Sequence, residues 1–210
     1  GQNTGAVYGF GLSAQIAVNF VGNITRAFVD VPGAVKAGGA VTVQATGRVD
    51  ATAVAAAVLV RPQSTPSLTL AGAFAWNELS NQTCGDPSTA DRRSTTLAWL
   101  SAPTVTAPTV TVLARSTDRP TTVALGVGAV LPHRTDAGKP VTVNLAGSVS
   151  VNRIHTGTTA SIGANTTITT TGDLTVQAQR DLRGYSVTGA VAVYGTVTAG
   201  AAIDVTLADD

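Results

Sequence analysis

Alternation of apolar and polar residues is the clearest local pattern in this chain. In the stretch VTVQA that begins at Val41, the first, third and fifth residues are apolar and the others are polar. A period of two is typical of a β-strand, whose successive side chains point to opposite faces. The pattern predicts that Val41, Val43 and Ala45 point into the protein, whereas Thr42 and Gln44 face solvent.

The same alternation returns at Thr167–Thr169 and at Leu174–Val176. Turn signals separate the alternating stretches, as at Gly38–Gly39, Ala137–Gly138 and Gly172–Asp173. Glycine and aspartate adopt the backbone conformations that tight turns need. The chain is therefore predicted to consist of many short strands joined by turns.

An internal repeat connects distant parts of the chain. The nine residues AGGAVTVQA at 37–45 return as TTGDLTVQA at 170–178. When residues 16–60 are placed on residues 149–193 without a gap, 13 of 45 positions are identical. A chain with this composition would give about five matches by chance, so the repeat indicates a structural unit that is built more than once.

We predict one domain, spanning residues 1–210, with three imperfect copies of this unit and the start of a fourth. The copies lie at about 8–60, 66–130 and 140–193, and the fourth begins at 194–210. The middle copy contains a polar insertion, residues 81–93, which is expected to form a surface loop.

Short segments of the middle copy correspond to segments of the other two. Phe74–Asn77 stands where Ile16–Asn19 and Val149–Asn152 stand, and Thr96–Leu100 resembles Thr25–Val29. Short strands that recur at a period of tens of residues indicate a parallel β-helix, or β-solenoid, in which each coil buries its apolar side chains against its neighbours. The alternative fold is a β-sandwich, which also consists of many short strands.

Composition supports an all-β fold and excludes some functions. The 210 residues include 33 Thr and 22 Gly but one Glu, two Lys and no Met, so strand formers and turn formers outnumber helix formers. A net charge of +1 and 4% aromatic residues argue against nucleic-acid binding. The most apolar run, Ala51–Val60, is too short for a membrane-spanning helix and is interpreted as a buried strand.

No arrangement of reactive residues indicates a catalytic centre. His133, His155 and Cys84 have no partners at metal-ligand spacing, and both histidines are expected in loops. Most carboxylates lie beside turn residues, which explains them without catalysis. The sequence therefore assigns no catalytic, cofactor-binding or metal-binding residues and no cofactor, and the chain is expected not to be an enzyme.

Two alternative functions stay open. Stacked coils can bring distant carboxylates together, as a carbohydrate-active β-helix enzyme would require. Pairs of threonines spaced as Thr-x-Thr can bind ice or another ordered surface, although they do not recur here at a uniform coil length. These pairs are Thr104–Thr106, Thr109–Thr111, Thr167–Thr169 and Thr169–Thr171.

The first and third copies resemble a known family. The segments AVN, TRAFVD, AGGAVTVQA and ATAVAAAVLV resemble repeats of large bacterial filamentous adhesins, the haemagglutinin-like and leukotoxin-like secreted surface proteins. The resemblance implies a right-handed parallel β-helix in a long exported rod, and it implies no catalytic residues.

We therefore expect a structural and adhesive stalk segment at the bacterial cell surface, outside the cell. Its expected partners are a host-surface or matrix ligand or a glycan, together with neighbouring repeats of the same parent chain. Neither nucleic acid nor a membrane span is expected.

Overall fold

The structure is a computed structural model, and it describes residues 9–62, 66–80, 94–131 and 141–209. Within these ranges the chain forms β-strands and no helix. In chain order the strands are β1 (Gly9–Val21), β2 (Ile24–Asp30), β3 (Val35–Lys36), β4 (Val41–Pro62), β5 (Ser67–Leu79), β6 (Ser94–Ser101), β7 (Thr104–Ala107), β8 (Val110–Leu131), β9 (Thr142–Ile162), β10 (Thr167–Thr170), β11 (Leu174–Leu182), β12 (Tyr185–Val193) and β13 (Val197–Asp209).

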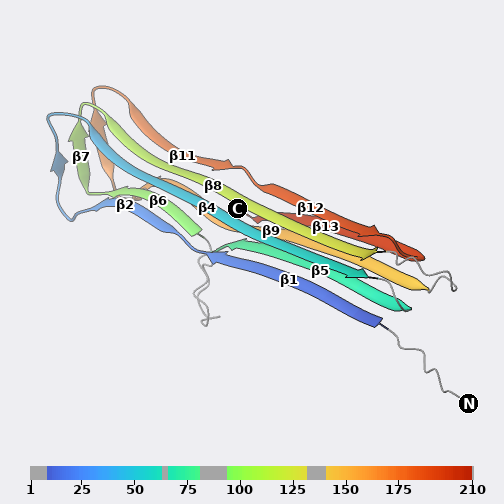
Figure 1. The fold of residues 1–210 in the computed structure, drawn as a ribbon. Coiled ribbons are helices and arrows are strands. Elements are labelled where there is room, and N and C mark those ends of the chain that lie inside the picture. The colour runs from blue at the N-terminus through green and yellow to red at the C-terminus, as the bar shows by residue number, and fades with distance from the viewer. Residues whose placement is uncertain (1–8, 63–65, 81–93, 132–140, 210) are drawn as a thin grey trace, which may run out of the picture.

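The strands stack as a parallel β-solenoid, which confirms the predicted fold class, whereas the β-sandwich alternative is wrong. Each coil runs out along one sheet, turns through a short strand at a narrow end, and returns along a second sheet (Figure 1). The first sheet contains β1, β5, β9 and β13, continued by β2 and β6; the second contains β4, β8, β11 and β12; β3, β7 and β10 form the narrow end. All ladders between the described strands are parallel.

The ladder register follows the sequence repeat. Ile16 pairs with Phe74, and Phe74 pairs with Val149 in the next coil. Phe28 likewise pairs with Trp99. The shift of 133 residues found in the sequence is therefore the chain length that separates strands two coils apart.

The strands are longer than the sequence predicted. Strands β4 and β8 contain 22 residues each, and β9 contains 21. A strand continues as long as its neighbours in the coils before and after supply ladder partners, and β8 pairs with β4 on one side and with β11 and β12 on the other. The positions of turn residues in the sequence do not predict the length of a strand, because that length depends on the strands of the adjacent coils with which it pairs.

One half of each coil, next to the narrow end, has an apolar interior. We call residues 24–50, 94–119 and 156–182 the conventional half. Its core contains Leu100, Val105, Val110 and Val112, which are all fully buried. This half buries its larger aliphatic side chains as ordinary globular domains do.

The predicted alternation at the start of β4 is confirmed. Val43 is 4% exposed and Ala45 is buried, while Thr42 and Gln44 are exposed. In the third coil Val176 occupies the same column as Val43, yet it is 45% exposed. Among the described residues no further strand stacks beyond β11, so this end of the column lacks a cover.

The other half of each coil inverts the usual distribution. We call residues 9–21, 51–62, 67–80, 120–131, 142–155 and 185–209 the inverted half. Its interior holds alanines, which pack as one cluster, and polar residues that are almost completely buried. These polar residues are Thr69, Asn77, Thr122, Thr142, Asn144, Ser148, Ser150 and Asn152. The fully buried Leu79 and Ile154 lie where this half joins the conventional half, and the fully buried Val130 lies toward its far end.

The apolar run Ala51–Val60 lies in the inverted half, and its interpretation as a buried strand is only half correct. Its alanines at 51, 53, 55 and 57 are buried, whereas Val54, Val58 and Val60 are exposed. The small side chains face inward because the two sheets approach closely, and the larger ones point out. Overall hydrophobicity therefore misled the sequence interpretation.

A column of asparagines joins the two sheets inside the inverted half. Asn19 donates to the Asn77 side-chain oxygen over 3.1 Å, and Asn77 donates to the Asn152 oxygen over 3.3 Å. Asn77 also donates to the carbonyl oxygens of Thr121 at 2.7 Å and Ala51 at 3.2 Å, which belong to the opposite sheet. These hydrogen bonds satisfy buried amide groups that would otherwise destabilise the interior.

Glycine permits the closest approach of the two sheets. A Cβ atom added at Gly126 would lie 2.4 Å from the backbone oxygen of Gly147 in the facing sheet. No side chain fits at that distance, so the spacing of the sheets requires glycine at this position.

Candidate binding surface

The outer side of the inverted half presents a continuous apolar surface. Along β1, β5, β9 and β13, twenty successive outward positions carry no charge, and the indole N–H of Trp76 is the one polar side-chain group among them. We call them the first apolar face. They are Phe10, Leu12, Ala14, Ile16, Val18, Leu68, Leu70, Gly72, Phe74, Trp76, Val143, Leu145, Gly147, Val149, Val151, Val197, Ala199, Ala201, Ile203 and Val205.

The large aromatic residues gather on this side of the molecule. Phe10, Phe74 and Trp76 belong to the first apolar face, Phe20 lies at its margin, and the Phe74 and Trp76 rings stack with centroids 6.1 Å apart. Phe28 and Trp99 continue the same outer side into the conventional half. All six phenylalanine and tryptophan residues thus lie on one side of a chain that has few aromatics.

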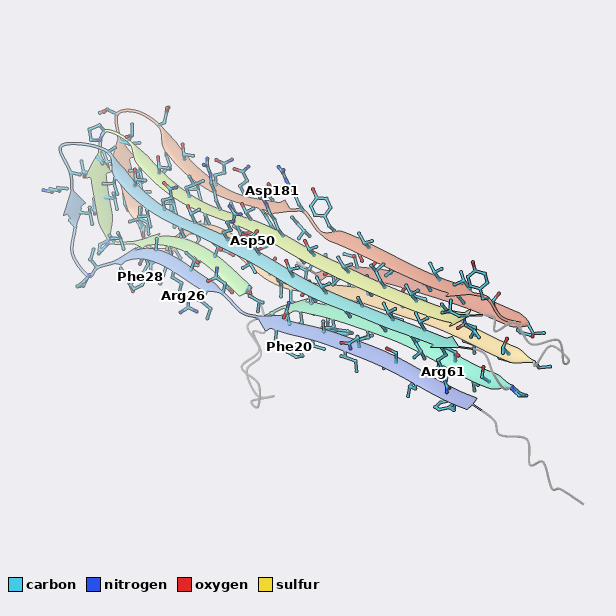
Figure 2. The ribbon with its side chains drawn as sticks, viewed as in Figure 1. Phe20, Arg26, Phe28, Asp50, Arg61 and Asp181 are labelled. Atoms are coloured by element: carbon cyan, nitrogen blue, oxygen red, sulfur yellow. The ribbon has the colours of Figure 1, made fainter. Side chains whose placement is uncertain are left out.

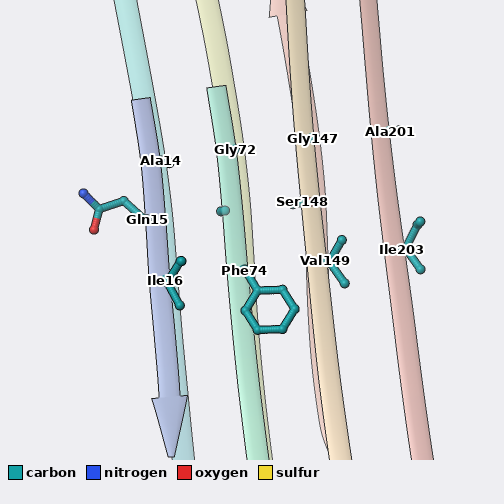
Figure 3. A pocket seen from close by; sticks show the side chains of 11 residues that line it. Ala14, Gln15, Ile16, Gly72, Phe74, Gly147, Ser148, Val149, Ala201 and Ile203 are labelled. Atoms are coloured by element: carbon teal, nitrogen blue, oxygen red, sulfur yellow. The ribbon is translucent and has the colours of Figure 1, made fainter. Parts of the chain in front are cut away.

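A groove crosses the middle of the first apolar face. Its floor is a row of small residues, namely Ala14, Gly72, Gly147 and Ala201, one from each coil. A row of large residues, namely Ile16, Phe74, Val149 and Ile203, stands beside it as a ridge (Figure 3). The hollow has a volume of about 390 Å³. The parallel register produces both rows, because equivalent positions of successive coils lie side by side.

A second hollow of about 340 Å³ lies on the same sheet, where the strands begin. Phe10, Leu68 and Val141 contribute its apolar walls. The first apolar face therefore has two hollows, one at its middle and one where the strands begin.

The opposite outer side of the inverted half is also apolar. We call it the second apolar face, and it extends over β4, β8 and β12. Its residues are Val54, Ala56, Val58, Val60, Val123, Leu125, Val127, Ala129, Val187, Gly189, Val191 and Val193. None of these twelve residues is aromatic, although the exposed Tyr185 flanks them on β12, and the face spans three strands rather than four.

Charged residues mark the conventional half of the outer surface. Figure 2 shows Arg26, Asp50 and Asp181 on that half, away from the strand ends near Arg61. Exposed ion pairs join Arg48 to Asp50 at 2.7 Å, and Arg183 to Asp181 at 3.0 Å. The outer surface thus changes character along each long strand, from charged and polar to apolar.

The carboxylates mostly lie inside strands, so the prediction that turns account for them is wrong. Asp118 in β8 is the most buried of those described, at 2% exposed. Its Oδ2 accepts a hydrogen bond from Thr156 at 3.1 Å and lies 3.6 Å from Nε of Arg180. Burial raises the pKa of Asp118, and the hydrogen bond from Thr156 and the charge of Arg180 partly oppose that rise.

The other buried carboxylate stands at the margin of the first apolar face. Glu78 Oε1 accepts a hydrogen bond from Ser80 at 3.4 Å and lies 3.9 Å from the Arg153 guanidinium. Glu78 and Asp118 belong to opposite sheets and are held by different partners, so each has its own ion pair.

Of the residues predicted to lie in loops, the structure describes His155. His155 lies inside β9, so its expected loop position is wrong; it stands beside Asp209 in the ladder. His133, Cys84 and the predicted surface loop at residues 81–93 lie outside the described residues. Across the part of the chain that is described, no three or more His, Cys, Asp or Glu side chains gather as a possible metal site.

The Thr-x-Thr pairs form a small array at the narrow end. Thr104 pairs with Thr167, and Thr106 pairs with Thr169. In the first coil Lys36 occupies the place next to Thr106. The narrow-end array of the pairs Thr104–Thr106 and Thr167–Thr169 is therefore two coils deep, whereas Thr111 in β8 pairs with both Thr42 and Thr175 and forms a threonine row three coils deep.

No described helix is long and apolar enough to cross a membrane. Comparison with protein-family models, with curated proteins and with solved structures gives no match for this chain.

The contoured apolar face can bind by shape and by burial of apolar area. Its outward side chains offer no nucleophile, no carboxylate and no metal ligand. Sequence inspection missed this surface because it assigned apolar residues to the interior. The signal was nevertheless present, since Ile16 to Asn19 alternates apolar residues with a small and an amide side chain.

Proposed function

We propose that this chain is a structural and adhesive stalk segment of an exported bacterial surface protein. The observation that supports the proposal best is the stacking of equivalent strands from successive coils in one register. An architecture of this kind extends by adding coils, and it transmits force through rows of backbone hydrogen bonds along the stacking direction.

The ends of the stack support the same function. β1 and β4 each pair on one side among the described residues, and β13 adds the first strand of a further coil on β9. Exposed strand edges pair readily with additional strands. Neighbouring repeats of a parent chain would continue both ends of this stack.

The outer surface supports a binding role over catalysis. The hollows on the first apolar face are lined by apolar side chains and by the small polar residues Gln15, Ser67 and Ser148. Such surfaces gain affinity from shape and burial. The resemblance of the repeats to filamentous adhesins agrees with this role and with a location at the cell surface.

Labelling of intact cells tests the proposed function. Antibodies raised against the purified chain should bind unpermeabilised cells of the source bacterium, and protease added outside should remove the signal. A cytoplasmic protein in the same cells must stay intact as the control. Labelling that requires permeabilised cells would show that the segment does not act at the surface.

A further inference from the structure

The first apolar face is as large as the largest apolar patches on monomeric proteins, which are often functional. Four strands about 4.8 Å apart and nine residues per strand at about 3.3 Å per residue give roughly 600 Å². The largest apolar patch on a typical monomer measures about 300–600 Å², and such patches are often functional. Ile16, halfway along the edge strand β1 of this face, is 73% exposed, and Phe74 and Val149 on the central strands are partly exposed.

We infer that a second copy of this chain covers the first apolar face, so that two solenoids associate face to face as a symmetric dimer. This inference goes beyond the proposed function and does not depend on it. It concerns the contact between two copies, whatever the cellular location of the protein.

Area favours the first face over the second. Two copies packed through the first apolar face bury roughly 1,200 Å² in total, which reaches the size of specific interfaces. The second apolar face has three strands with seven residues per strand, which give roughly 330 Å² per copy at the same spacings and leave a second-face contact below about 1,000 Å². Association through the apolar faces should therefore stop at a dimer.

The ridge and the groove of the first apolar face are complementary to each other. Their rows lie two residues apart along the strands, or about 7 Å. A two-fold axis in the plane of contact, parallel to the rows and midway between them, places the ridge of one copy over the groove of the other. The contacts are then Ile16 over Ala14, Phe74 over Gly72, Val149 over Gly147 and Ile203 over Ala201.

The composition of the face agrees with a protein partner. Aromatic residues are enriched at the centres of protein interfaces, and charged residues are depleted there. Phe74 and Trp76 lie on a central strand of the face, and their rings stack on each other. Glu78 and Arg153 lie at its margin, where a polar rim is expected.

A variant that enlarges a groove residue distinguishes this specific dimer from non-specific association of apolar surfaces. A Cβ atom added at Gly72 meets no atom within 4 Å, so Gly72→Leu leaves the single copy unstrained. The variant adds apolar surface yet fills the groove. A ridge-in-groove dimer is then weakened, whereas association with lipid or non-specific aggregation is strengthened.

Sedimentation equilibrium of the purified 210-residue chain tests the inference. We expect a monomer–dimer equilibrium, and we expect Gly72→Leu and Ile16→Lys each to raise the dissociation constant by about tenfold or more. Ala56→Leu, which places a leucine on the second apolar face, should leave it unchanged. Phe28→Lys, which places a charge on the conventional half at a residue 66% exposed, should also leave it unchanged.

Circular dichroism must show native strand content for every variant. A monomer at all concentrations would overturn the inference, as would growth beyond the dimer. Equal strengthening of association by Gly72→Leu and Ala56→Leu would identify non-specific contact. Flotation of the wild-type chain with phosphatidylcholine–phosphatidylglycerol vesicles, reduced by Ile16→Lys, would identify lipid as the occupant of the face instead.

Discussion

At the scale of single residues, buried amides replace the aliphatic core in the inverted half. Asn77 connects its own coil to Asn152 in the next coil and to two carbonyl oxygens of the facing sheet. The sequence contained this feature, since an asparagine ends each of the three corresponding segments. Its inward orientation followed only from the structure, because asparagine in isolation favours turns.

Replacement of the central asparagine should destabilise the fold. Asn77→Ala removes the hydrogen bonds to the Thr121 and Ala51 carbonyl oxygens of the opposite sheet, and it removes the side-chain oxygen to which Asn19 donates. We expect the free energy of unfolding to fall by about 1–3 kcal/mol in urea denaturation. Gln177→Ala, at an exposed position of β11, is the control and should change little. Equal stability of Asn77→Ala and wild type would contradict the role of the column.

The buried carboxylate of Asp118 should make stability depend on pH. Because burial raises its pKa in the folded state above 3.8, the folded chain binds this proton more tightly than the unfolded chain. Its contribution to stability is therefore most favourable below pH 3.8 and declines as the pH rises through the folded-state pKa. Asp118→Asn should lack that decline. If the stability difference between wild type and variant stays constant or rises with pH, the assignment is wrong.

At the scale of strands, the sequence predicted the repeats and their register better than the lengths and faces. The shift of 133 residues matches the ladder partners Ile16, Phe74 and Val149. Alternation placed Val43 inside and Thr42 outside correctly. In the run Ala51–Val60 both faces of the strand are apolar, so the sequence shows no alternation of apolar and polar residues there. The narrow distance between the two sheets determines which residues face inward.

The narrow spacing of the sheets can be tested at one glycine. Gly126→Ala places a methyl group 2.4 Å from the Gly147 backbone oxygen, so the sheets must separate locally. Such overpacking costs about 1–3 kcal/mol of unfolding free energy. Gly38→Ala adds the same methyl group where nothing lies within 4 Å, and it should be tolerated. Thermal unfolding of the two variants side by side distinguishes them; equal melting temperatures would refute the close approach.

At the scale of the whole molecule, one solenoid combines two kinds of cross-section. The conventional half encloses mainly aliphatic side chains and presents charges, whereas the inverted half encloses mainly amides, hydroxyls and alanines and presents apolar faces. The sequence indicated the solenoid, because short repeats with small residues have few other solutions. The candidate binding surface could not be predicted from it, since a surface of this kind appears only when equivalent positions of four coils lie side by side.

The inverted half is the central claim, and cysteine labelling at two adjacent positions tests it most directly. In a Cys84→Ser background, Val54→Cys and Ala55→Cys place a thiol on the outer side and the inner side of β4. Val54 is 58% exposed and Ala55 is 3% exposed. The thiol introduced at position 54 should react with maleimide under native conditions at close to its rate in urea, and the thiol at position 55 should be strongly protected. Protection at position 54 with reactivity at position 55 would show that valine faces inward, and would contradict this account.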